Sequence, residues 1–275
     1  MKFLAAILCG VVLVSGADLE RKSTIQRSFS LTGNGSKRLD VDNLRGFIHV
    51  LDTSGTAIEM TAYETIRAKS SGEADEAARN VKLEISQNGN AVTLYVDGPW
   101  RNRHWELRDP NYNVEFDFDV KVPAGTELNL STVTDGDVEA KNTSGDFDLK
   151  NVNGEIDLVD VSGSGEVKTV NGPIRASFAR NPRGDCSFRT VNGPIEFQVQ
   201  PGLSADLRFK TFQGGVYTDF PVSALPRLAA TAVRKDGKFV YRSNDFQGVR
   251  IGSGGPEYKF ETLNGDIRIL KRGKS

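Results

Sequence analysis

The stretch KTVNGPI, residues 168–174, recurs almost unchanged as RTVNGPI, residues 189–195. A shorter form of this signature occurs five times, at spacings of 18, 21, 21 and 51 residues. The five copies are KNVNG (150–154), KTVNG (168–172), RTVNG (189–193), KTFQG (210–214) and ETLNG (261–265). Glycines also recur every nine residues from Gly136 to Gly172. The repeat unit is therefore about 18 residues long and has two nine-residue halves.

Within each unit, apolar residues stand two before, two after and four after the glycine, as in Val170, Ile174 and Ala176. A spacing of two is the alternation of a β-strand with one face buried. We expect all three positions to face the core. The same positions hold Val191, Ile195 and Phe197 in one later copy, and Leu263, Ile267 and Ile269 in another.

Two architectures produce such a pattern. Asn-Gly is a strong signal for an antiparallel hairpin. A two-residue hairpin, however, closes with an N–H from the residue after the glycine, and Pro173 and Pro194 have none. The sequence therefore predicts an all-β fold built as a parallel β-solenoid (β-helix) with about 18–21 residues per rung. In this fold Asn-Gly lies at a corner, and stacked asparagine amides are expected to form a ladder. Ile174 and Ile195 are expected to stack in one inward column of parallel strands.

The region before the repeats is also predicted to be β. VEFDFDVKV, residues 114–122, alternates without a fault, and GEADEAARNVKLEI, residues 72–85, is the one short helix candidate. We expect residues 18–125 to form an N-terminal β region that caps the open edge of the repeats. Residues 126–275 hold the β-solenoid repeats, with an insertion near 216–260.

The first 17 residues read as a signal peptide. Lys2 is followed by an apolar run and then by small residues, with Ser15 and Ala17 suited to a cleavage site. The expected location is therefore outside the cytoplasm: periplasm, cell surface or secreted. Cys9 is the alternative lipid-attachment residue, although the small residue such a site needs is missing before it. Cleavage leaves Cys186 as the single cysteine, either a small buried side chain or a link between two chains.

The repeats resemble those of a bacterial putative-adhesin family of unknown function, whose domains carry SGDI- and NGDI-type turns. The matching segments are TDGDVEA, TSGDFDL, VNGEIDL, VNGPIRA, VNGPIEF and LNGDIRI, with LDVDNLRGFIHV upstream. The resemblance covers nearly all of the chain after residue 17, except about 216–260. It implies a β-helical fold and an envelope or surface location, and it supplies no catalytic residues.

Composition and motifs favour no known chemistry. The net charge of -1 gives no electrostatic case for nucleic acid as a partner. The two histidines are His49 and His104, and the sequence has no HExxH, CxxC, GxSxG or P-loop motif. We therefore expect no catalytic residues, no metal site and no cofactor. No second apolar run follows the leader, so no transmembrane segment is expected.

Acidic residues gather in the first repeats. They are Asp135, Asp137, Glu139, Asp146, Asp148, Glu155, Asp157 and Asp160. Three interpretations stay open: a solvated outer face, calcium between the corners, or carboxylate pairs acting on a glycoside. Glycine- and aspartate-rich repeats that bind calcium carry a G-G-x-G-x-D pattern, which these units lack.

Basic residues occupy one register of the repeats, at Lys150, Lys168, Arg189 and Lys210. Stacked cations repel one another unless acids or an anionic ligand lie between them. Neighbouring acids and an anionic glycan are the two interpretations.

The segment DGPWRNRHWELRDPNY, residues 97–112, holds both tryptophans of the chain. Aromatic faces beside arginines suit sugars or anionic ligands. The candidate ligand-binding residues are Trp100, Arg101, Arg103, His104, Trp105 and Arg108. The alternative is that the tryptophans plug the end of the β region.

The sequence thus predicts a non-catalytic, secreted or envelope-associated binding protein of adhesin type. A surface glycan or an envelope protein is the expected partner. A lyase or glycosidase acting on polysaccharides is the rival function. The sequence leaves the oligomeric state open.

Overall fold

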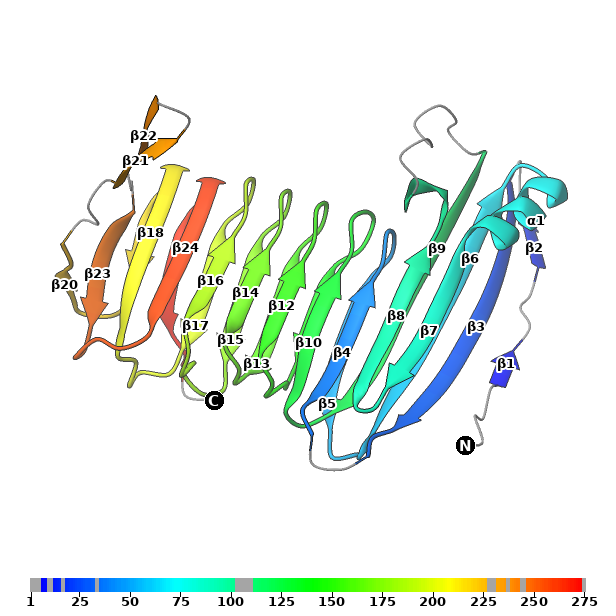
Figure 1. Cartoon of the computed structure of the whole chain (residues 1–275), viewed down its shortest axis with the longest axis horizontal. Coiled ribbons are helices and arrows are strands. Elements are labelled where there is room, and N and C mark those ends of the chain that lie inside the picture. Colours follow the sequence, from blue (N-terminus) through cyan, green and yellow to red (C-terminus); the bar gives the residue numbers. More distant parts are fainter. Residues whose placement is uncertain are drawn as a thin grey trace.

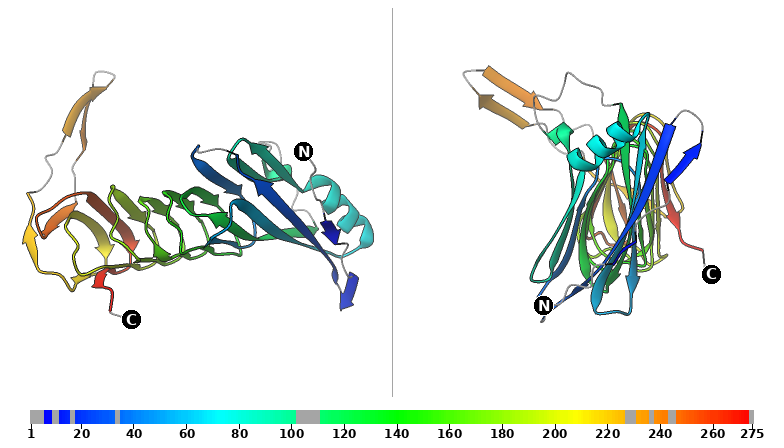
Figure 2. Two further views of the ribbon diagram at one scale, coloured as in Figure 1. Left: turned by 90° about the horizontal axis from the view of Figure 1, so that it is seen from below. Right: turned by 90° about the vertical axis from the view of Figure 1, so that its right-hand side faces the viewer.

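The computed structural model describes residues 6–8, 12–15, 18–32, 35–101, 111–226, 231–235, 238–242 and 246–273. Two long β-sheets face each other along the whole molecule and enclose one continuous apolar core (Figures 1 and 2). We call them sheet A and sheet B. A single α-helix, α1 (Ser71–Asn80), lies over one end among the described residues, and a hairpin projects from the other end.

Sheet A has the strand order β1-β3-β6-β9-β5-β11-β13-β15-β17-β25-β19, with β2 also paired to β3. Its strands are β1 (Ala6–Leu8), β2 (Val12–Ser15), β3 (Asp18–Ser30), β5 (Ile48–Thr53), β6 (Ala57–Ala68), β9 (Tyr112–Pro123), β11 (Val138–Lys141), β13 (Ile156–Val161), β15 (Ile174–Phe178), β17 (Ile195–Val199), β19 (Val216–Thr218) and β25 (Ile267–Lys271).

Sheet B has the order β20-β23-β18-β24-β16-β14-β12-β10-β4-β8-β7. Its strands are β4 (Lys37–Asp42), β7 (Lys82–Asn88), β8 (Ala91–Asp97), β10 (Thr126–Ser131), β12 (Phe147–Lys150), β14 (Gly165–Lys168), β16 (Cys186–Arg189), β18 (Ala205–Gln213), β20 (Val222–Ala224), β23 (Gln247–Ile251) and β24 (Glu257–Asn264). The projecting hairpin is β21 (Thr231–Lys235) and β22 (Lys238–Arg242), and Pro99–Arg101 forms a short 3₁₀ turn.

Strand alternation builds the core between the sheets. Ile174 pairs in parallel with Ile195, and both are fully buried, which confirms the predicted column. Aromatic rings fill the space between the central strands, where Phe197 lies 5.1 Å from Phe178 and 5.2 Å from Phe260 between ring centroids. Cys186 is buried among them as a small apolar side chain.

The predicted parallel β-solenoid is wrong as a description of the fold. The chain is all-β with one helix, but its strands form two large mixed sheets. Antiparallel pairs occur at both ends, such as β3 with β6, β7 with β8, and β18 with β23. For β7 and β8 the reason is local, because Asn88 and Ala91 are joined by a two-residue Gly89-Asn90 hairpin turn, with positive φ at Gly89, outside the repeats.

The order of strands also departs from a stack of successive turns. Strands β24 and β25, from the C-terminal copy of the signature, lie between β16 and β18 and between β17 and β19 respectively. The copy at 261–265 therefore separates the copies at 189–193 and 210–214. The chain passes this place once, continues through β18 to β23, and returns to fill it.

One predicted inward position faces outward. Val170 and Leu263, two residues before their glycines, are 39% and 47% exposed. The buried residue at this corner is the preceding threonine, because its hydroxyl donates to a glycine carbonyl of the neighbouring unit. Thr169 Oγ1 donates to Gly154 O at 2.9 Å, and Thr190 Oγ1 donates to Gly172 O at 2.9 Å.

The helix lies where the sequence predicts one, but it is shorter. It begins at the N-cap Ser70, whose hydroxyl accepts from the Glu73 N–H, and it buries Ala74 and Ala77. Residues 82–85, predicted as its C-terminal turn, belong instead to strand β7. Residues 6–8 and 12–15 of the predicted leader pair with β3 as β1 and β2. Cleavage after residue 17 and the export of the chain stay predictions.

Candidate ligand-binding surfaces

An asparagine ladder runs along one corner of the molecule, where strands of sheet B turn into strands of sheet A. The side chains of Asn153, Asn171, Asn192 and Asn264 stack in this order. Each amide N–H donates to the carbonyl oxygen of the one before it, at 2.8, 2.8 and 2.7 Å. All four residues are exposed. Adjacent parallel strands lie about 4.8 Å apart, so the ladder presents amides at that period.

A strip of apolar side chains flanks the ladder. It consists of Val152, Val170, Val191, Leu263 and Phe212, each directly before a ladder residue or, for Phe212, before Gln213. All of them except the half-buried Val191 are exposed, and Phe212 is 79% exposed. We call the ladder and this strip together the amide ridge. Such a contiguous exposed apolar strip is the mark of an interaction surface.

The ridge ends in a groove of about 450 Å³. Val191, Leu263 and Phe212 form its apolar side, and Arg189 and Lys210 stand on its other side. Neither cation is free, because Glu261 lies between them, 3.5 Å from Arg189 and 3.3 Å from Lys210.

Acids accompany the whole basic register that the sequence predicts. Lys150 pairs with Asp148 and Lys168 with Glu166, each at 2.7 Å. The four cations do not lie on successive strands, because Glu261 of β24 lies between Arg189 and Lys210. These pairs are exposed and add little stability. Of the two interpretations of the basic register, pairing with neighbouring acids is the one that the structure shows.

The acidic residues predicted as one cluster are divided between different surfaces. Asp137, Glu139, Glu155 and Asp157 lie on the outer face of sheet A, whereas Asp148 lies on sheet B. The division follows from the chain path, since the two halves of each unit run in opposite sheets.

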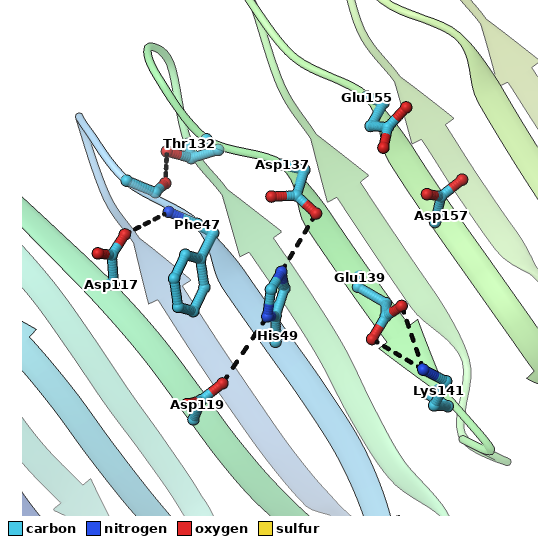
Figure 3. Close-up of polar contacts among 12 residues, drawn as sticks. Phe47, His49, Asp117, Asp119, Thr132, Asp137, Glu139, Lys141, Glu155 and Asp157 are labelled. Carbon is cyan, nitrogen blue, oxygen red and sulfur yellow. Dashed lines mark hydrogen bonds and ion pairs between the residues drawn. The ribbon is translucent and has the colours of Figure 1, made fainter.

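The outer face of sheet A gains further groups from strands distant in the sequence (Figure 3). His49 of β5 lies between two carboxylates, with Nε2 3.1 Å from Asp137 and Nδ1 3.7 Å from Asp119. Its ring stacks on Phe47 at 4.1 Å between centroids. The Phe47 N–H donates to Asp117 Oδ1 at 3.0 Å. We call this set, with Glu139, Glu155 and Asp157, the acidic face.

Partners occupy every carboxylate of the acidic face. Glu139 pairs with Lys141, while Glu155 and Asp157 share Arg175, at 2.6 and 3.4 Å. Burial raises the pKa of Asp117 and of Asp157, and the neighbouring Glu155 raises that of Asp157 further. Within the described ranges, no group of three or more His, Cys, Asp or Glu is arranged to hold a metal ion. The partners of these six carboxylates include only two permanent cations, Lys141 and Arg175, so the face stays acidic on balance.

The predicted binding loop is described only in part. Trp100 packs half-buried against the edge of the core, with its ring over Gly98. Arg101 forms an ion pair with Asp42 at 3.0 Å and lies 4.5 Å from the centre of the Tyr95 ring. Arg103, His104, Trp105 and Arg108 lie outside the described residues. A ligand at this loop stays a prediction.

Sequence reasoning missed the exposed side of the signature. It assigned the valine to the core and recognised the asparagine only as a corner residue with a stacked amide. The threonine before the valine was the signal that could have corrected this. Its hydroxyl can be buried when it donates to a backbone carbonyl, and the valine next to it then faces outward. His49 was missed as a neighbour of the repeat acids because it lies 88 residues from Asp137 along the chain. Asp117 and Asp119 of β9 were missed because β5 inserts between β9 and β11, which no local pattern indicates.

Comparison with known proteins gives structural likenesses only. No family model matches the sequence, and no curated protein matches it. A putative cell adhesion protein from Clostridium sporogenes superposes with a TM-score of 0.43 and 12% identity, over 92% of this chain and 100% of that one. A putative adhesin from Bacteroides fragilis gives 0.40 and 12%, over 90% and 97%. A putative lipid binding protein from Parabacteroides distasonis gives 0.30 and 10%, over 91% and 97%.

The described part of the chain contains no helix of the length and apolarity required to span a membrane.

Proposed function

We propose that this chain is a non-catalytic binding protein of adhesin type that holds an extended polysaccharide along the amide ridge. The observation that carries the proposal is the exposed ladder beside an exposed apolar strip. The two inner amides, Asn171 and Asn192, each use one N–H and the carbonyl oxygen within the ladder, which leaves a second N–H for hydroxyl groups of a ligand. Apolar side chains and the exposed Phe212 ring supply faces on which sugar rings stack.

The ridge favours a glycan over a protein strand. A strand that adds to a sheet needs free backbone N–H and C=O groups. At the ridge these groups are already paired, as where the Asn171 N–H donates to Val152 O and the Gly172 N–H donates to Asn192 O. Side chains are therefore what the ridge offers. The signal peptide predicted at residues 1–17 supports an exported location for this binding, at the surface, in the periplasm or secreted.

A glycan-array screen of the purified protein tests the proposal. The replacement Phe212→Ala removes the most exposed aromatic ring, and Tyr63→Ala removes a 40% exposed ring on the outer face of sheet A as the matched control. We expect Phe212→Ala to weaken glycan binding about tenfold or more, equivalent to about 1.4 kcal/mol. Tyr63→Ala should bind as the wild type does, and both should melt near the wild-type temperature.

Two results would contradict the proposal. One is a screen without any glycan bound, or with binding reduced equally by both replacements. The other is release of shortened sugar products from a bound polysaccharide, which would favour the lyase or glycosidase alternative.

A further inference from the structure

The end of the molecule formed by β3 and β7 is only half covered. Strand β7 is the last strand of sheet B at this end. In sheet A, only the short strands β1 and β2 lie beyond β3. Helix α1 crosses the upper part of this end, packs against β6, β9 and β3, and is tied to β3 by the ion pair of Arg21 with Asp75 (Figure 2). Beyond the helix, the half-exposed Leu83 and Ile85 of β7 form the edge of the core.

A groove of about 490 Å³ occupies the uncovered part. Its apolar wall is Phe29 from β3 with Leu83 and Ile85 from β7. Phe29 belongs to the buried core, and the other two pack against it while half-exposed. Gln87 bounds the groove at its lower end, because its Nε2 donates to Ser30 O and Gly89 O, both at 2.9 Å.

Arg27 is the one charged residue in the lining of this groove. It lies on the same face of β3 as Phe29, two residues away. Its guanidinium donates to Gln26 O at 3.2 Å and forms no ion pair with any described residue. The other cations of the strand are paired, Arg21 with Asp75 and Lys22 with Glu20. An apolar wall with one uncompensated cation is complementary to an apolar chain with one negative head.

We propose that this groove binds a single-chain fatty carboxylate, with the chain on Phe29, Leu83 and Ile85 and the carboxylate on Arg27. Ligand sites of this kind are mostly apolar, carry few polar groups and measure about 300–1,000 Å³. The groove lies in the lower half of that range, which favours one acyl chain over the two of a diacyl lipid. An arginine pairs well with a carboxylate because its planar fork makes two parallel hydrogen bonds.

Titration of the full chain with octanoate, decanoate and dodecanoate tests the apolar part. Each buried methylene should strengthen binding about fourfold until the groove is full. Decan-1-ol is the neutral probe of the same length, and it should bind the wild type at least tenfold more weakly than decanoate. Equal affinities across the three carboxylates, or no binding of dodecanoate, would overturn the proposal.

Two replacements and one control distinguish binding of the carboxylate from binding of the acyl chain. Arg27→Gln should weaken decanoate to the affinity of decan-1-ol and leave decan-1-ol unchanged, whereas Lys22→Gln on the same strand should alter neither. Ile85→Trp fills the groove and should remove binding of both probes. If Ile85→Trp does not fold, the comparison of Arg27→Gln with Lys22→Gln still decides. Unaltered decanoate binding by Arg27→Gln would overturn the proposal.

Discussion

At the scale of single residues, each position of the TVNG signature has a separate physical role. Thr190 is buried and donates its hydroxyl to Gly172 O, while Val191 stands at the corner outside the core. Asn192 continues the amide ladder, and Gly193 allows two backbones to approach closely. The signature is repeated because every unit must meet the next at the same corner.

The closest contact of the signature is at its glycine. A Cβ added at Gly172 would lie 2.1 Å from the carbonyl oxygen of Gly154, a backbone atom that also accepts from the Thr169 hydroxyl. We therefore expect Gly172→Ala to lower the free energy of unfolding by about 2–4 kcal/mol. Denaturant unfolding followed by circular dichroism measures this.

Gly72 in α1 is the control for that replacement. A Cβ there meets nothing within 4 Å, so Gly72→Ala should raise stability by about 0.5–1 kcal/mol through its effect on the unfolded chain. The two replacements thus have opposite signs. An unchanged unfolding midpoint for Gly172→Ala would contradict the prediction and show that neighbouring corners can move apart to admit a Cβ.

Burial gives Cys186 a dependence of stability on pH. It raises the pKa of the thiol from its ordinary value of 9.0 to about 11. The folded state therefore keeps the proton that the unfolded state loses, so this contribution is complete below pH 9 and is lost as the pH rises toward 11. The free energy of unfolding should fall by on the order of 1–2 kcal/mol across this window. Cys186→Ala should lack that part of the fall, and identical pH profiles for both proteins would contradict the prediction.

At the scale of elements, the final two strands hold the distal third of both sheets together. Four of their side chains, Tyr258, Phe260, Ile267 and Ile269, are fully buried. Tyr258 also donates its hydroxyl to Pro182 O at 2.7 Å. Each such side chain contributes about 1.5–3 kcal/mol by burial. Their sum is comparable with the net stability of a whole domain, which is about 5–15 kcal/mol.

Removal of residues 257–275 should therefore unfold more than the strands removed. Strands β18 and β19 would lose their parallel partners, and β16 and β17 would each lose one neighbour. We expect limited proteolysis of this variant to cut throughout residues 186–256, with β4 to β14 protected. Removal of residues 273–275 alone should leave the digestion pattern of the full chain. Equal resistance of both variants would contradict the prediction.

At the scale of the whole molecule, local periodicity was sufficient for some features and not for others. The inward column through Ile174 and Ile195 could be predicted because strand alternation is local. The positions of Lys210 and Glu261 could not, since nothing in the spacing states that the chain leaves a gap and later fills it. The acidic face shows the same limit, as His49 and Asp117 join Asp137 only through pairing between distant strands. The ridge was partly predictable, but a valine beside a buried threonine was assigned to the wrong side.

Because β24 and β25 are made late but lie inside the two sheets, neither sheet can be completed until residues 257–271 have been synthesised. During synthesis, β18 and β19 leave the ribosome before the strands they must pair with exist. Contacts between segments so distant in sequence form slowly. Until translation has passed Lys271, open strand edges remain available to chaperones and proteases. A product that stops before Glu257 keeps those edges permanently, so cellular quality control can distinguish it from a chain that contains β24 and β25.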